Sequence, residues 1–319
     1  MKKYIAGDFV LDRILHIKPK YKNYIVLNPK QNDISYMDYL GFSNVPSQDL
    51  ISNNTDTYST VTDLKTSLSE LALTINTICY DVVLNVHLDI FNAKDDINNK
   101  VLKGTENFSS NPRNVFTLAR YKAKLPDFVV DPKTQEEAES LAFDVYKLTS
   151  DEINKELELG FSTENPYIFI ENLNSLGVTG VIFGDILNKK SLEMVKHTIE
   201  NSTPKHSFDF IIYRCGIDVD VKFEIPLSTV TFCDFMDTHI DFLSNIQVHE
   251  PKEIADFFEM YAYEFNSEEI FFYKVLEYLI ITNEITSLER DVIVRLFDVY
   301  NDTSEEVNKT LQEYSSVLK

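Results

Sequence analysis

The stretch from His206 to Leu227, HSFDFIIYRCGIDVDVKFEIPL, alternates apolar and polar residues more regularly than any other part of the chain. A period of two is typical of strands that bury one face. A two-residue turn at Cys215-Gly216 would pair the two halves in a register that makes one face wholly apolar. That face would hold Phe208, Phe210, Ile212, Val219, Val221 and Phe223. The pattern therefore predicts a β-hairpin whose apolar face packs on a core.

The opposite face of the predicted hairpin is charged and has two interpretations. Asp209, Asp220 and Lys222 have an order similar to the Asp…Asp-x-Lys arrangement of metal-dependent nucleases, in which two carboxylates hold Mg²⁺. The same letters describe an ordinary cross-strand ion pair on a solvated face. A third acid on a helix and an extended basic surface are both missing from the pattern, so the sequence favours the ion pair.

The residues around Cys215 also carry a family resemblance. Arg214-Cys215 ends the first predicted strand, and the second has apolar residues at alternate positions up to Leu227. From residue 206 to 235 the chain resembles the strand–turn–strand insert of baseplate hub and hub-assembly proteins of contractile-tailed phages. The family's turn is longer and has paired cysteines, whereas Cys215 stands alone, so no metal knuckle is expected. The resemblance implies a structural protein of a phage tail.

The stretch TVTDLKTSLSELALTINTIC predicts a helix with a narrow apolar stripe. Its apolar residues recur at spacings of three and four, the a/d pattern of a helix that packs along one partner. A globular helix packed on a neighbour in the same chain gives this pattern, and so does a contact with another subunit. The candidate interaction residues are Val61, Leu64, Leu68, Leu71, Ile75 and Ile78.

Two basic islands interrupt an acidic chain, which has 51 Asp and Glu against 30 Lys and Arg and a net charge of −21. Residues 107–126 contain no acid, and the bases gathered there are Arg113, Arg120, Lys122 and Lys124. The second island is HIKPKYK at residues 16–22. We expect the islands to meet acidic surface of this chain or of a copy. Because the field of the whole chain repels polyanions, no direct nucleic-acid contact and no membrane contact are expected.

Coarser patterns divide the rest of the chain. NYIVL reads as a strand, residues 131–160 as two helices, and residues 190–202 as a helix, while NPYIFIENL and GVTGVIF read as strands or buried segments. After Cys233 the composition becomes helical, with starts marked by Pro251 and by the capping boxes Thr286/Glu289 and Thr303/Glu306. Three aromatic residues with helical spacing are further interaction candidates: Phe257, Phe258 and Tyr261.

These patterns predict an α+β fold: a mixed N-terminal body that contains the β-hairpin, followed by a C-terminal helical region. The body would span residues 1–235, with a sub-boundary near 125–135 as an option, and an acidic helical domain would span 236–319. No apolar run approaches the roughly 20 residues that cross a bilayer. Three widely spaced cysteines argue against a disulfide framework.

The motifs of catalysis are missing from the sequence. The six histidines lack the spacing of a metal site, no Gly-x-Ser-x-Gly occurs, and eight glycines leave little material for phosphate-binding loops. We therefore predict that the chain is not an enzyme and uses no cofactor or metal. The leading hypothesis is a non-catalytic structural or assembly component of a phage virion, in the tail or baseplate. Its partners would be other protein subunits, including copies of itself, in the virion and in the host cytoplasm during assembly.

A second hypothesis comes from the charge of the C-terminal region. Residues 250–319 contain sixteen acids against six bases, and carboxylates along helices can imitate the phosphates of DNA. The alternative function is therefore an acidic inhibitor of a nucleic-acid-binding enzyme.

Overall fold

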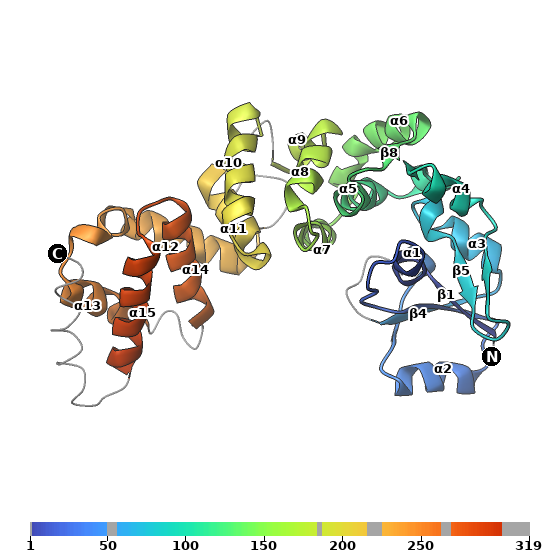
Figure 1. Ribbon diagram of the computed structural model, residues 1–319, viewed down its shortest axis with the longest axis horizontal. Coiled ribbons are helices and arrows are strands. Elements are labelled where there is room, and N and C mark those ends of the chain that lie inside the picture. Colours follow the sequence, from blue (N-terminus) through green and yellow to red (C-terminus); the bar gives the residue numbers. More distant parts are fainter. Residues whose placement is uncertain (1, 50–55, 184–186, 216–224, 263–268, 302–319) are drawn as a thin grey trace. The chain divides into compact units, whose positions relative to one another are not determined.

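The computed structural model describes residues 2–49, 56–183, 187–215, 225–262 and 269–301 (Figure 1). Contacts divide the chain into two compact units, the first formed by Met1–Leu192 and the second beginning at Glu193. The first unit mixes strands and helices, and the described part of the second is helical. The predicted α+β class is therefore confirmed. In the described residues, no helix is both long and apolar enough to cross a bilayer.

A six-stranded mixed sheet begins the first unit. Its strand order is β3-β4-β2-β1-β5-β6, with β2 and β4 parallel, β3 and β4 parallel, and the remaining neighbours antiparallel. The strands are rich in β-branched and aromatic residues, and the predicted NYIVL strand is confirmed as β2. The strands are β1 (Lys2–Ala6), β2 (Asn23–Leu27), β3 (Ser43–Asn44), β4 (Thr57–Val61), β5 (Cys79–Asp81) and β6 (Val86–Leu88).

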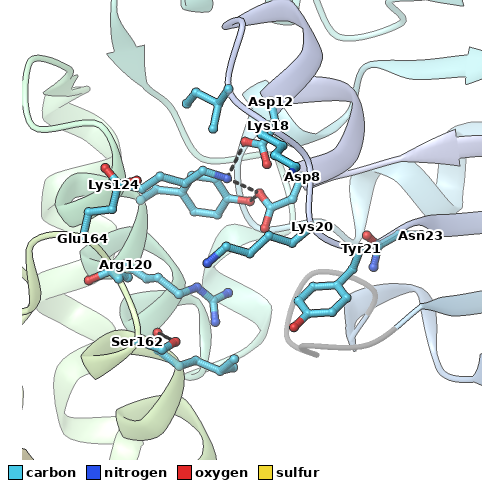
Figure 2. Close-up of a pocket in the computed structure, with 14 residues that line it drawn as sticks. Asp8, Asp12, Lys18, Lys20, Tyr21, Asn23, Arg120, Lys124, Ser162 and Glu164 are labelled. Carbon is cyan, nitrogen blue, oxygen red and sulfur yellow. Dashed lines mark hydrogen bonds and ion pairs between the residues drawn. The ribbon is translucent and has the colours of Figure 1, made fainter. Parts of the chain in front are cut away.

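Short helices connect the strands, and the remainder of the first unit is a helical layer built around α5 (Asn114–Lys124). Nine of the eleven α5 residues are buried, and α5 packs against α7 and α8. The basic end of α5 meets α1 through an ion pair, which Figure 2 shows. The other helices are α1 (Asp8–Ile14), α2 (Gln31–Tyr39), α3 (Leu64–Ser69), α4 (Ala93–Asn98), α6 (Pro132–Leu141), α7 (Ser150–Phe161), α8 (Pro166–Ser175) and α9 (Val178–Phe183), and the short strands β7 (Val101–Leu102) and β8 (Val129–Val130) pair in parallel.

The strands that the sequence suggested for NPYIFIENL and GVTGVIF are wrong. Both segments are helices, α8 and α9. Pro166 occupies the first turn of α8, where its fixed backbone angle and missing N–H suit a helix start. Phe169, Ile170 and Leu173 then share the buried face with helical rather than alternate spacing.

The single helix predicted over residues 61–78 is also wrong. Val61 ends β4, helix α3 ends at Ser69, and a 3-10 turn, η2 (Thr74–Asn76), leads into β5. Side-chain hydroxyls explain the break, because the Thr105 hydroxyl donates to the carbonyl oxygens of Ser69 and Leu71 at 3.0 and 2.8 Å. Those carbonyls are the acceptors that a continuing helix would use.

The apolar residues of the same stretch are nevertheless core residues of the first unit. Leu68, Leu71, Ile75 and Ile78 are all buried, and Val61 and Leu64 are partly buried. The spacing therefore reports burial correctly, although the backbone is not one helix.

The predicted hairpin is wrong in its first half, and residues 216–224 of its second half lie outside the described residues. Residues Pro204–Cys215 form helix α11, on which Phe210, Ile211 and Ile212 are buried in succession. A strand would place Ile211 on the face opposite its neighbours. Alternation over so few residues does not distinguish a strand from a buried helix.

Asp209 of α11 does not lie on a solvated strand face. Its carboxylate pairs at 3.0 Å with the ammonium of Lys274, whose side chain is 6% exposed. That ammonium also lies 4.7 Å from the ring centroid of Phe232 and 5.2 Å from that of Phe271. Asp209 is therefore part of the packing of the second unit.

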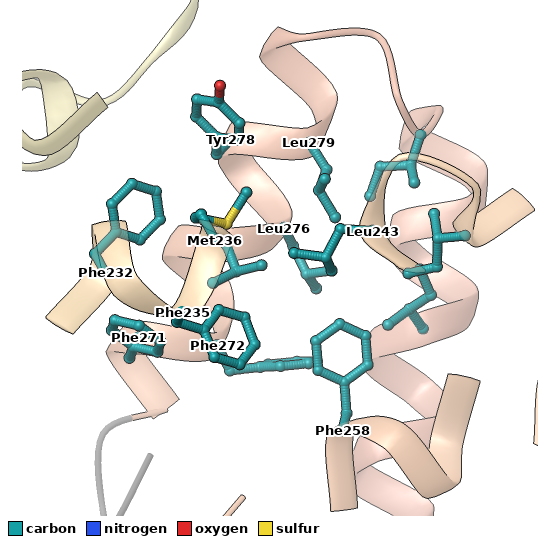
Figure 3. Close-up of a cluster of buried hydrophobic side chains, with 14 of the residues drawn as sticks. Phe232, Phe235, Met236, Leu243, Phe258, Phe271, Phe272, Leu276, Tyr278 and Leu279 are labelled. Carbon is teal, nitrogen blue, oxygen red and sulfur yellow. The ribbon is translucent and has the colours of Figure 1, made fainter. Parts of the chain in front are cut away.

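The second unit is a helical bundle around an aromatic core (Figure 3). Phe258 and Phe272 are fully buried and meet edge to face with centroids 4.8 Å apart, and Phe257 and Tyr261 pack against the same core. The predicted helix start at Pro251 and the Thr286/Glu289 capping box are confirmed. The remaining helices are α10 (Lys189–Asn201), α12 (Leu227–Leu243), α13 (Pro251–Ala262), α14 (Glu269–Ile281) and α15 (Ser287–Asn301).

Three further sequence predictions concern this part of the chain. The proposed domain boundary between residues 235 and 236 falls inside α12. The capping box Thr303/Glu306 lies outside the described residues. The helix predicted near 190–202 is confirmed as α10.

Candidate functional site

The two basic islands of the sequence converge on one pocket of the first unit (Figure 2). The cavity has a volume of about 200 Å³, above the roughly 150 Å³ of an engineered cavity that holds benzene. It lies between the loop after α1, the start of β2, one side of α5 and the end of α7. Its lining residues are Asp8, Asp12, Ile17, Lys18, Lys20, Tyr21, Asn23, Arg120, Tyr121, Lys124, Leu159, Ser162, Thr163 and Glu164.

Lys124 forms the base of the pocket together with two carboxylates of α1. Its Nζ lies 2.6 Å from Asp12 Oδ1 and 3.2 Å from Asp8 Oδ1. Burial disfavours the charged ammonium, but Asp8 and Asp12 outweigh this effect and raise the pKa of Lys124. Burial raises the pKa of Asp12, with Lys124 opposing that change. The three side chains are a compact group in which one cation is shared by two acids.

The backbone conformation of the preceding residue, Gly7, determines where Asp8 lies. Gly7 has φ of 69°, a conformation that residues with a Cβ rarely adopt, and it turns the chain from β1 into α1. The carbonyl oxygen of Gly7 accepts from the N–H groups of Val10 and Leu11. Asp8 follows at once as the first residue of α1, so it lies just beyond the carboxyl end of β1.

A hydrogen bond from Tyr121 fixes the carboxylate of Asp8. Its hydroxyl donates to Asp8 Oδ1 and accepts from Asn76 Nδ2 at 2.5 Å. Burial, and then the charge of Asp8, raise the pKa of Tyr121 well above its ordinary value, so the hydroxyl remains a donor. Asp8 therefore has a fixed geometry, with its charge already met by Lys124.

The four basic residues predicted from the acid-free segment have different roles. Arg120 and Lys124 line the pocket. Arg113 pairs with Asp49 at 2.6 Å and with the fully buried Glu156 at 3.0 Å. Lys122 donates to the carbonyl oxygens of Pro126 and Phe128, both at 2.6 Å, and so ties down the chain after α5.

Glu156 of α7 pairs both with Arg113 and with the pocket residue Arg120. Arg120 Nη1 lies 3.5 Å from Glu156 Oε2, and the two side chains are 10% and 0% exposed. Arg113 and Arg120 share this carboxylate, and Asp49 supplies a second negative charge to Arg113, so the charges of the four side chains balance.

The rim of the pocket is cationic. Lys18 and Lys20 are exposed and have no ion-pair partner among the residues that the structure describes. Figure 2 shows the side chains of Lys20 and Arg120 extending into the same part of the pocket, below Lys124 in this view. Cationic side chains around a partly enclosed space favour an anion, and a guanidinium beside ammonium groups suits the oxygens of phosphate. The pocket is therefore a candidate site for a phosphate-bearing ligand.

Sequence reasoning identified the two basic islands but not the pocket that they form. Lys18 and Lys20 were noted only as part of an island, and Asp8, Asp12 and Glu164 were not identified at all. The usable signal was GD directly after the strand KKYIA, because a glycine and an acid at the end of a strand often mark a site at the edge of a sheet.

The chain is similar in sequence and in fold to known proteins. No protein-family model matches the chain. A curated relative, the CCA-adding enzyme of Buchnera aphidicola subsp. Baizongia pistaciae, is 28% identical over 214 residues, which are 63% of this chain. The chain spans 49% of the length of that relative.

Solved structures cover nearly the whole chain. A tRNA-processing enzyme in its apo form matches with a TM-score of 0.69 and 15% identity, over 99% of this chain and 93% of that one. A tRNA nucleotidyltransferase complexed with a primer tRNA and an incoming ATP analog matches with a TM-score of 0.65 and 14% identity, over 94% and 96%. The fold is that of a tRNA nucleotidyltransferase.

These findings correct the functional predictions made from the sequence. The similar proteins are CCA-adding and tRNA-processing enzymes and not phage baseplate hub proteins, so the resemblance drawn from residues 206–235 is wrong. The hypotheses of a virion structural component and of a DNA-mimicking inhibitor are overturned with it, as is the virion location. The predictions of a non-enzyme without nucleic-acid partners fail as well, because the relatives are enzymes and one neighbour is bound to tRNA.

Proposed function

We propose that this chain acts on tRNA, holding a nucleoside triphosphate in the pocket of Figure 2 beside the 3′ end of the RNA. The observation that carries the proposal is the convergence of Lys18, Lys20, Arg120 and Lys124 on one cavity. The similarity to CCA-adding enzymes supports it, since structures of such enzymes include complexes with ATP and with CTP.

The net charge of −21 does not oppose this function once charge is considered locally. Four bases and three acids line the pocket, so its lining has a small excess of positive charge, which favours anionic ligands. Lys18 and Lys20 project from an exposed loop, where they can meet phosphates of the RNA backbone or of a nucleotide, while Arg120 and Lys124 lie deeper and are held in ion pairs.

The pocket residues do not fit a divalent metal ion. Mg²⁺ in polymerase-type sites is held by carboxylates together with substrate phosphates. Here Lys124 Nζ lies 3.2 Å from Asp8 Oδ1 and 2.6 Å from Asp12 Oδ1, and so occupies the position from which an ion would contact both carboxylates. Because Lys124 is shared by two carboxylates and Arg120 is paired with Glu156, the excess positive charge that can meet a triphosphate in this pocket comes from Lys18 and Lys20.

Replacement of Lys20 tests the proposal. We expect Lys20→Ala to weaken tRNA binding about tenfold and to lower the slope of log K against log salt concentration by about 1, because one phosphate contact is lost. The measurement is filter binding of labelled tRNA over a range of salt concentrations. Lys133→Ala is the matched control, since Lys133 is an exposed lysine of α6 outside the pocket.

A second arm of the experiment uses ATP and CTP as ligands in titration calorimetry. Binding of either nucleotide, weakened by Lys20→Ala and not by Lys133→Ala, supports the proposal. The proposal is overturned if neither nucleotide binds, or if tRNA binds no more tightly than an unrelated RNA hairpin.

A further inference from the structure

At the base of the pocket, two carboxylates share a single cation. Two carboxylates, Asp8 and Asp12, approach a single cation at 3.2 and 2.6 Å from the same helix, α1. The cation is an ammonium group from α5, and Asp12 is 8% exposed in this pair. A buried acid without a partner would cost several kcal/mol, and Lys124 supplies one of the two positive charges that a divalent ion would bring between these carboxylates.

The ammonium cannot readily move away from this place. Lys124 lies on the buried helix α5, its side chain is 24% exposed, and its Nζ also lies 5.6 Å from the ring centroid of Tyr121. Tyr121 in turn fixes Asp8 by a hydrogen bond. A divalent ion could bind both carboxylates only by displacing Lys124 into a pocket that is also lined by the cationic side chains of Arg120 and Lys20.

We infer that Lys124 is a built-in replacement for a divalent cation, so that this pocket binds a nucleoside triphosphate without Mg²⁺. The inference rests on the proposed function. The exposed Lys18 and Lys20 provide positive charge on the open side of the pocket, where the phosphate oxygens would lie. The ligand class is a nucleotide polyphosphate in its metal-free form.

The first test needs no variant. The dissociation constant of ATP is measured by calorimetry with the full chain, once with excess MgCl₂ and once with excess EDTA. We expect the two values to agree within about threefold. A loss of affinity of about tenfold or more in EDTA overturns the inference.

The second test removes the ammonium. In Lys124→Ala, Asp8 and Asp12 lose their cation and are free to take a divalent ion. We expect ATP binding by this variant to be about tenfold weaker than wild type in EDTA and to recover when Mg²⁺ is added. Lys122→Ala is the matched control on the same helix, because Lys122 bonds carbonyl oxygens outside the pocket. The same affinity in both buffers for Lys124→Ala contradicts the inference.

Binding of Mn²⁺ alone, followed by its electron paramagnetic resonance signal, gives a readout that does not depend on nucleotide. We expect Lys124→Ala to bind Mn²⁺ more tightly than wild type does. Lys124→Arg, which keeps the positive charge, should bind Mn²⁺ as wild type does. If Lys124→Ala does not fold, the dissociation constants of ATP for wild type in MgCl₂ and in EDTA still test the inference. Failure of ATP to bind in either buffer rejects the proposed function, whereas binding only with Mg²⁺ leaves that function standing and rejects this inference.

Discussion

Replacing Glu156 by glutamine is expected to lower the free energy of unfolding of the first unit by about 3–5 kcal/mol. Glu156 is fully buried and is the shared acceptor of Arg113, at 3.0 Å, and Arg120, at 3.5 Å. Glutamine keeps the shape of the side chain but leaves both guanidinium groups without that negative charge. The measurement is denaturation by urea, monitored by circular dichroism.

The control for this prediction lies on the same helix. Glu158 is exposed, so Glu158→Gln should change stability by no more than about 0.5 kcal/mol. If the two variants unfold at the same urea concentration, the buried ion pairs do not stabilise the unit as their geometry indicates.

Replacing Gly160 by alanine should also destabilise the first unit, by about 1–3 kcal/mol. Gly160 lies in α7, and a Cβ there would overlap three ring atoms of Phe169 in α8. Phe169 is fully buried and meets Phe161 edge to face, so its ring has no open space into which it can move. The intrinsic preference of helices for alanine, about 1 kcal/mol, acts in the opposite direction and is outweighed by the overlap.

Gly180 supplies the matched control, because a Cβ at this position of α9 meets nothing within 4 Å. Gly180→Ala should therefore leave stability unchanged or raise it by up to about 1 kcal/mol. Thermal and urea unfolding of both variants measure the difference. Equal effects of the two substitutions would show that overlap with Phe169 is relieved by movement of the helices.

Several elements could be predicted because their signals are local. A helix cap involves residues three positions apart, so the Thr286/Glu289 box and the start at Pro251 were readable from the sequence alone. The strand NYIVL was equally clear, since β-branched residues concentrate in it.

The elements that were missed depend on contacts distant in the sequence. The alternation in residues 208–212 was compatible with a strand until Asp209 met Lys274 of α14 and Thr229 of α12. Likewise, α3 ends where Thr105 takes the carbonyl oxygens of Ser69 and Leu71. No window of the sequence contains both partners of these contacts.

The site was missed for a related reason. The sequence showed two basic islands and a strongly negative total, and the total was used to exclude nucleic acid. A pocket responds to the charges that line it, and Lys20 and Lys124 become neighbours only when the loop before β2 lies against α5. No local pattern in the sequence indicates that residues 16–22 and 113–124 lie close together in the fold.

The order of strands in the sheet has a consequence for how the protein forms. β1 lies in the interior of the sheet, between β2 and β5, and its pairing Tyr4↔Asp81 joins the beginning of the chain to a segment made much later. The parallel partners β2 and β4 also require a crossover before they can pair. Contacts of such separation slow folding, since loop closure must precede the gain from pairing. During synthesis, one edge of β1 therefore stays unpaired until β5 has left the ribosome. In that interval the unpaired edge can associate with other chains.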